Sequence, residues 1–174
     1  MLFRSLIGHK LLEPYQGGPA EGGYVSGWGI WCPGPVVRTQ ADHATLLSPE
    51  MYARQILPFD LEIIRACPHC IFHLHNPGLH VAPALLEVDE LDVIEVVVDP
   101  YPREARKPYE MAMYARILER KPLILDVNFP SLEEAAWVLG ELPHRGLCLN
   151  ARFAPETMSE MAPDKPARET WVLK

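Results

Sequence analysis

The sequence has little of what marks a nucleic-acid-binding, membrane or disulfide-rich protein. Its 16 lysines and arginines are outnumbered by 23 aspartates and glutamates, and the net charge of −7 argues against nucleic acid or an anionic membrane surface as the main partner. No apolar run approaches the roughly 20 residues that cross a bilayer. His9, Lys10 and Glu13 come too early for the apolar core of a signal peptide. Four cysteines are too few for a disulfide scaffold, so we expect a reducing, cytoplasmic setting.

Several motifs that identify a reaction are also missing. The chain has no glycine-rich phosphate loop, no nucleophile elbow and no H-E-x-x-H sequence. Nucleotide hydrolysis and serine hydrolase chemistry therefore have no support from the sequence.

What is present fits one globular domain. The chain has 174 residues, 48% of them apolar, and its 18 prolines indicate many short elements separated by turns. Residues 1–35 are rich in glycine and proline, and we expect an irregular segment there. The ordered domain should span residues 36–162, and residues 163–174 form a polar, proline-rich tail.

Five predicted strands alternate with predicted helices, which is typical of an α/β protein with parallel strands. The strands are expected at residues 36–42, 70–75, 93–98, 123–127 and 147–151. The first helix begins after the capping residue Ser48, with Pro49 at its first position, and should run to about Ala66 with a kink near Pro58. The other helices are expected at residues 81–86, 103–120, 131–142 and 155–161.

Each predicted strand has one apolar face and one face that becomes polar toward its carboxyl end. Side chains alternate along a strand, so residues two apart share a face. The residues of the polar faces are Arg38, Gln40 and Asp42 in the first strand, His73 and His75 in the second, Glu95 in the third, Asp126 and Asn128 in the fourth, and Cys148, Asn150 and Arg152 in the fifth. Ligand sites of parallel α/β proteins lie at this end of the strands, and a polar side on every strand favours the mouth of a barrel over a sheet covered on both faces.

The number of strands is too small for a closed barrel. A (β/α)₈ barrel needs eight strands and about 250 residues, whereas this chain supplies five strands. We therefore expect a partial (β/α)₈, TIM-barrel-like arrangement. Either the chain is part of a longer barrel, or it forms an open arc that a second copy, as a homodimer, or another chain with the missing strands must cover.

The pair His73-x-His75 is the best candidate for a metal site. Two imidazoles on one strand face are spaced to share a metal, and carboxylates or a thiol from neighbouring strands can complete the ligand set. The available partners are Glu95, Asp99, Asp126 and Cys148. The alternative is a polar pocket in which the histidines form hydrogen bonds without a metal.

The motif Cys67-Pro-His-Cys70 has two further interpretations, a redox pair and a structural zinc site. A redox cysteine is activated at a helix N-terminus, but this motif follows a helix and enters a strand, where the helix dipole opposes a thiolate. A zinc site shared with the histidines needs Cys70 and His73 to converge, although they face opposite sides of the strand.

Five segments of the chain resemble the uroporphyrinogen decarboxylase superfamily, in order and in spacing, over roughly residues 30–160. They are Asp42–Glu50 followed by Ile56–Pro58, Phe72–Gly78, Leu85–Glu87 through Leu91–Glu95, Lys121–Leu123 and Arg145–Leu147. The resemblance implies a (β/α)₈ barrel of which this chain is the C-terminal portion.

The two known branches of that superfamily imply different activities. One branch decarboxylates uroporphyrinogen without a cofactor and carries an arginine-rich N-terminal segment and a C-terminal glycine-histidine segment, which this sequence lacks. The other transfers methyl groups between corrinoid proteins and thiols, with a His-x-Cys motif and a distant cysteine on zinc. His73 matches that histidine, His75 stands in place of the first cysteine, and Cys148 lies in about the strand of the second.

The resemblance therefore implies a zinc-dependent enzyme of the methyltransferase type that acts on a small molecule or on a corrinoid carried by a partner protein. The alternatives are a decarboxylase-like lyase and a non-catalytic half-barrel that serves as a binding or assembly subunit. The expected metal ligands are His73, His75 and Cys148. The expected catalytic groups are Asp42, Glu95 and Asp126, and the expected substrate-binding groups are Arg38, Gln40, Asn128, Asn150 and Arg152.

Overall fold

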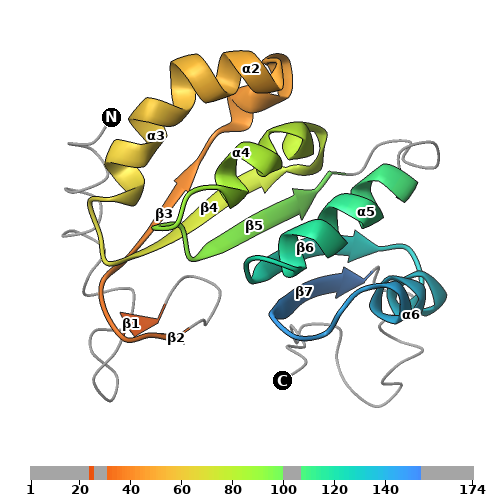
Figure 1. Cartoon of the computed structure of the whole chain (residues 1–174). Coiled ribbons are helices and arrows are strands. Elements are labelled where there is room, and N and C mark those ends of the chain that lie inside the picture. The colour runs from red at the N-terminus through yellow and green to blue at the C-terminus, as the bar shows by residue number, and fades with distance from the viewer. Residues whose placement is uncertain (1–23, 26–30, 100–106, 154–174) are drawn as a thin grey trace.

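The computed structural model describes residues 24–25, 31–99 and 107–153. Its main feature is a sheet of five parallel strands in the order β3-β4-β5-β6-β7 (Figure 1). The strands are β3 Val36–Gln40, β4 His69–His75, β5 Val93–Val98, β6 Leu123–Phe129 and β7 Leu147–Phe153. Helices alternate with them, so the predicted α/β fold with a partial, barrel-like sheet is confirmed.

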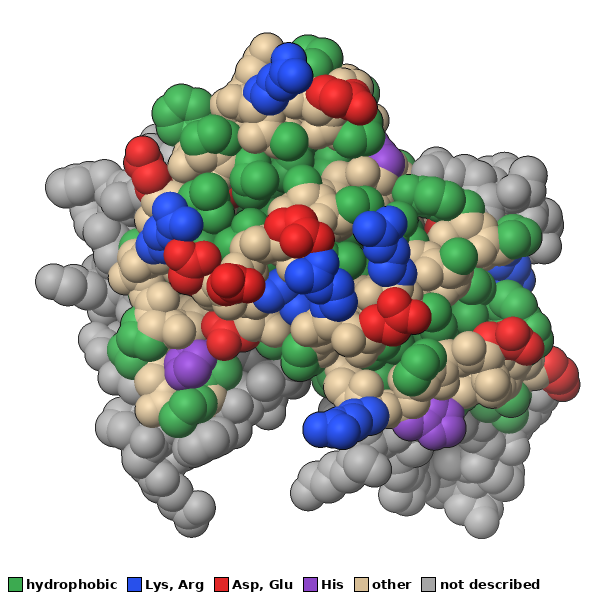
Figure 2. Space-filling model, in the orientation of Figure 1, with side chains coloured by type: hydrophobic (Ala, Val, Ile, Leu, Met, Phe, Trp, Pro, Cys, Tyr) green, Lys and Arg blue, Asp and Glu red, His purple; other side chains and the backbone are tan. Residues whose placement is uncertain are grey.

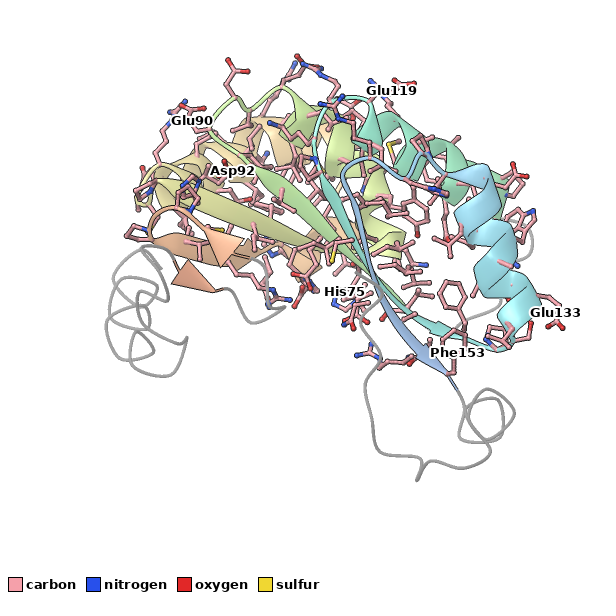
Figure 3. All side chains as sticks on the ribbon, turned by 90° about the horizontal axis from the view of Figure 1, so that it is seen from below. His75, Glu90, Asp92, Glu119, Glu133 and Phe153 are labelled. Carbon is pink, nitrogen blue, oxygen red and sulfur yellow. The ribbon has the colours of Figure 1, made fainter. Side chains whose placement is uncertain are left out.

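The helical elements lie between successive strands. They are η1 Asp42–Leu46, α2 Pro49–Met51, η2 Tyr52–Ile56, α3 Leu57–Ile64, η3 Asn76–Val81, α4 Ala82–Leu86, α5 Lys107–Leu118 and α6 Leu132–Glu141. The strands follow one another in the sheet as they do in the chain, and right-handed crossovers in one direction place the described helices on the same face. Figures 1 and 3 show the helices on one side of the sheet, with the other side turned away from them.

The helix-covered face of the sheet forms the hydrophobic core. Phe72, Leu74 and Val96 are fully buried there, together with Tyr114 and Ile117 of α5. On the outer side of the helices, charged groups of both signs alternate (Figure 2). None of the helices described is long and apolar enough to span a membrane.

The predicted first helix is present but contains a π-helical turn. Ser48 caps it as expected, because its Oγ accepts a hydrogen bond from the Met51 N–H at 3.2 Å. Pro58 has no N–H and its ring clashes with the carbonyl four residues earlier, so the preceding turn widens and the Leu57 N–H bonds to Tyr52 instead. The helix ends at Ile64, two residues before the predicted end.

The opposite face of the sheet has an apolar layer near the amino ends of the strands. Val36, Ile71 and Ile124 form this layer, and Cys32 and Cys148 pack against it. Cys32 belongs to a short antiparallel pair, β1 Tyr24–Val25 with β2 Trp31–Cys32, inside the segment predicted to be irregular. The predicted helix at 155–161 and the tail at 163–174 lie outside the described residues.

Four strand boundaries differ from the predicted ones. β4 begins at His69, one residue earlier than expected. β3 ends at Gln40, because Asp42 begins the 3₁₀ helix η1 instead of continuing the strand. β6 and β7 each run two residues further than expected, since they pair with each other through Phe129 and Phe153.

Candidate metal centre

The polar face predicted from the sequence exists and is held in register by the parallel ladders. His73 pairs with Gln40 on one side and with Glu95 on the other, and Asp126 pairs with Asn150. These residues alternate with the core-facing ones, so their side chains share the face on which none of the described helices lies. His75 projects on that side in Figure 3. The apolar layer near the amino ends and the polar layer near the carboxyl ends match the layered interior of a barrel.

Asp42, His73 and His75 are arranged as a possible three-ligand metal site. One ligand atom from each lies within 4.8 Å of the others. The Asp42 Oδ1 is 4.0 Å from the His73 Nε2 and 3.7 Å from the His75 Nε2. Around a tetrahedral ion with bonds of about 2.1 Å, neighbouring ligand atoms are roughly 3.4 Å apart. Both Asp42 distances exceed that spacing, so a shared ion requires Asp42 to move closer to the histidines.

Each histidine is backed by a carboxylate on its other ring nitrogen. The His75 Nδ1 is 2.9 Å from the Asp99 Oδ2, and the His73 Nδ1 is 3.2 Å from the Glu95 Oε1. A carboxylate that accepts from Nδ1–H leaves the lone pair of Nε2 for a metal and fixes the ring orientation, which is the usual outer shell of metal-binding histidines.

Arg38 competes for the same nitrogen of His73. Its Nη2 lies 2.8 Å from the His73 Nδ1 and 3.1 Å from the Glu95 Oε1, and its Nε donates to the Glu95 Oε2 at 2.6 Å. A guanidinium only donates, so the Nδ1 either accepts from Arg38 or carries a proton and donates to Glu95. A metal on the Nε2 requires the second arrangement.

The two acidic groups of the face differ in their electrostatics. Glu95 is fully buried, which by itself raises its pKa, but hydrogen bonds from His73 and Arg38 outweigh burial and hold the pKa at about 2. Burial also raises the pKa of Asp126, and there Arg152 and Asn150 only partly offset it. Glu95 is therefore ionised at any physiological pH.

A second polar network joins β6 and β7 beside the histidines. Asp126 forms an ion pair with Arg152 and accepts a hydrogen bond from the Asn150 Nδ2 at 3.2 Å. The Arg152 Nε donates to the Asn128 Oδ1 at 3.0 Å. The Arg152 side chain remains 47% exposed, so it is accessible from the open side of the sheet.

The structure brings most of the predicted site residues together, with one exception. Arg38, Glu95 and Asp42 surround the histidines, and Gln40 donates to the Asp42 Oδ2 at 3.0 Å. Cys148, the predicted third ligand, lies outside the ligand cluster. It pairs with Ile124 and packs in the apolar layer, where burial raises the pKa of its thiol. Asp42 takes its place in the ligand cluster.

The cysteines of the C-x-x-C motif do not join this site either. Cys70 is buried in the core with Phe72, on the helix side of β4, whereas His73 faces the opposite side. Burial, with a contribution from Asp92, raises the pKa of Cys70 to about 12. The predicted divergence of Cys70 from the histidines is confirmed.

Sequence reasoning gave Asn76 and Glu110 no role in the site, and it named Asp99 only as a possible ligand. Asp99 is instead the partner of the His75 Nδ1, and Asn76 supports it. The position of Asn76 directly after the histidine strand was a usable signal. The position of Glu110 within a helix was not.

The charges of the face leave an excess of two negative charges. Among the described residues four carboxylates face two guanidiniums, and a divalent cation would balance them. The carboxylates are Asp42, Glu95, Asp99 and Asp126, and the guanidiniums are Arg38 and Arg152. A cavity of about 580 Å³ beside Lys121 and Gly146 lies at the amino end of the strands, away from this face, and contributes nothing to the site.

Comparison of the chain with protein-family models, curated proteins and solved structures gives no match. The resemblance to the uroporphyrinogen decarboxylase superfamily therefore stays a prediction from the sequence.

Proposed function

We propose that this chain is the metal-binding part of a (β/α)-barrel enzyme, in which His73, His75 and Asp42 bind zinc and leave one coordination position open. The observation that supports this is the orientation of the two histidines. Both direct the Nε2 toward Asp42, and both have a carboxylate on the Nδ1. Two nitrogens and one carboxylate oxygen are a ligand set of catalytic zinc sites, and Fe(II) also binds to it.

The reaction we propose is methyl transfer to a thiol, as in the methyltransferase branch of the superfamily that the sequence resembles. A zinc ion with an open position lowers the pKa of a bound thiol and so supplies a thiolate nucleophile. The methyl donor would be a corrinoid on a partner protein. In this proposal Glu95 and Asp99 hold the imidazoles, and Arg38 and Arg152 bind the polar part of the substrate.

Metal content of the purified protein tests the site. We expect about one equivalent of zinc or iron, which the double variant His73→Ala, His75→Ala loses. His69→Ala is a matched control, because His69 lies on the same strand and face with Asp92 3.4 Å from its Nδ1 but far from Asp42 along the strand. Full metal retention in the double variant would refute the assignment.

Two further variants separate the third ligands. Asp42→Asn should weaken metal binding, whereas Cys148→Ala should leave it unchanged, because Cys148 is in the apolar layer. The opposite pattern would show that Cys148, as expected from the sequence, is the third ligand in place of Asp42.

Activity is a separate test. The metal-loaded protein should accelerate methyl transfer from methylcobalamin to a small thiol, followed by the absorbance change of the corrinoid. If the metal-loaded protein lacks this activity, the proposed metal centre stands but methyl transfer is refuted. The decarboxylase-like lyase would then be the favoured function. A protein that binds no metal would favour a non-catalytic half-barrel.

A further inference from the structure

Behind His75 lies a buried polar pair to which neither the fold nor the proposed reaction gives a role. Asn76 and Glu110 are both 0% exposed. Asn76 begins η3 directly after the histidine strand, and Glu110 is in the first turn of α5. Burying polar groups of this kind is costly unless their hydrogen bonds are satisfied.

Asn76 uses both ends of its amide. Its Oδ1 accepts from the backbone N–H of Asp99 at 3.0 Å, and its Nδ2 donates to the Glu110 Oε1 at 3.0 Å. The side chain therefore connects the carboxyl ends of β4 and β5 to α5. The acceptor on Glu110 also determines which end of the amide faces Asp99, because the nitrogen must point to the carboxylate.

Asp99, whose backbone N–H bonds to Asn76, is the residue that orients His75. Asp99 follows the end of β5, and its side chain is 37% exposed. Its carboxylate contacts the His75 Nδ1 through both oxygens, at 2.9 and 3.0 Å. A backbone fixed at the Asp99 N–H keeps the carboxylate on the ring and so keeps the Nε2 directed at the metal position.

We propose that Asn76 and Glu110 are positioning residues of the metal centre, acting through Asp99 on His75. This inference rests on the proposed metal site. Loss of an outer-shell partner of a metal-bound histidine typically weakens metal affinity 10–100-fold. A purely structural role predicts lower stability with unchanged metal affinity.

Zinc affinity, measured by competition with a chromophoric chelator, tests the proposal in a set of related variants. Asn76→Asp keeps an acceptor for the Asp99 N–H but places two carboxylates together, and should weaken zinc binding at least 10-fold. Glu110→Gln alone keeps an acceptor for Asn76 and should bind zinc within a few-fold of wild type. The double variant Asn76→Asp, Glu110→Gln exchanges donor and acceptor, restores both hydrogen bonds and should recover the affinity.

Tyr52→Phe is the control for loss of a buried hydrogen bond elsewhere. The Tyr52 hydroxyl donates to the Asp60 Oδ2 at 2.8 Å in the core, on the other side of the sheet. This variant should be less stable with unchanged zinc affinity. The visible spectrum of the Co(II)-loaded protein should change in Asn76→Asp and not in Tyr52→Phe, because only the first alters the histidine geometry.

Failure of the proposed metal site and failure of the positioning role give different results. If wild type binds no zinc, the proposed function fails and this inference with it. If wild type binds zinc, either unchanged affinity in Asn76→Asp or no recovery in the double variant overturns the inference alone. If Asn76→Asp does not fold, Asn76→Ala replaces it, and its zinc affinity must fall by the same factor.

Discussion

The ion pair of Arg38 and Glu95 should respond very differently to loss of its two partners. The Arg38 side chain is 40% exposed and the Glu95 side chain 0%. Arg38→Met therefore leaves a fully buried carboxylate with His73 as its one remaining partner among the described residues, whereas Glu95→Gln leaves a guanidinium that can turn toward water.

The expected costs follow from that asymmetry. Stranding a buried charge costs about 3–5 kcal/mol, and the remaining hydrogen bond from His73 to Glu95 favours the lower end, about 3 kcal/mol. Glu95→Gln loses hydrogen bonds to a charged group without stranding a buried charge, and should cost about 1–3 kcal/mol. The double variant Arg38→Met, Glu95→Met removes both charges and should be more stable than Arg38→Met alone.

Urea unfolding at pH 7 with a chelator present measures these differences in the metal-free protein. With a slope of about 2 kcal/mol per molar urea, a loss of about 3 kcal/mol lowers the midpoint by roughly 1.5 M. The reasoning fails if Glu95→Gln is as destabilised as Arg38→Met. It also fails if the double variant is no more stable than Arg38→Met.

Three further predictions concern other parts of the chain. Burial raises the pKa of Asp60, so native-state stability falls as pH rises from the ordinary value of 3.8 through the raised one. Asp60→Asn should therefore unfold at a higher temperature than wild type at pH 7 and lose that advantage near pH 4. Cys67 and Cys70 should react slowly with a thiol reagent at pH 7, because burial raises both pKa values; a pKa well below about 7 from the rate profile would contradict this. Within the described residues β3 and β7 each pair on one side only, and we expect association with a second copy or with a chain carrying the missing strands. A monomer in sedimentation at micromolar concentration, with no dye-detectable apolar surface, would argue against it.

The fold was predictable because its signals are local. The β-branched run at 93–98 forms a strand with those bounds, and alternation along each strand gave both faces of the sheet. The ends of β6 and β7 were not predictable, because Asn128 and Phe129 stay in the ladder through their partners Arg152 and Phe153. That information lies in the neighbouring strand.

Which face of the sheet carries the candidate site was predictable, but how far along the strands each side chain lies was not. Alternation places Cys148 on the polar face, but only the register shows that it lies opposite Ile124, in the apolar layer below the histidines. Asp42 does lie beside the histidines, but not because it continues the first strand as expected. It leaves the strand and begins a 3₁₀ turn, held by the bond from the Thr45 Oγ1 to the Asp42 carbonyl at 3.0 Å.

That turn gives the three candidate ligands unequal freedom. His73 is 5% exposed and His75 lies in the same strand, so sheet hydrogen bonds and the two backing carboxylates fix both rings. The Asp42 side chain is 54% exposed, and in the described part of the chain its carboxylate accepts one hydrogen bond, from Gln40. The distances of 3.7 and 4.0 Å to Asp42 exceed the roughly 3.4 Å of a tetrahedral site. In the proposed metal site the two histidine nitrogens are therefore the fixed ligands, and Asp42 is the ligand that would move, because its movement costs least.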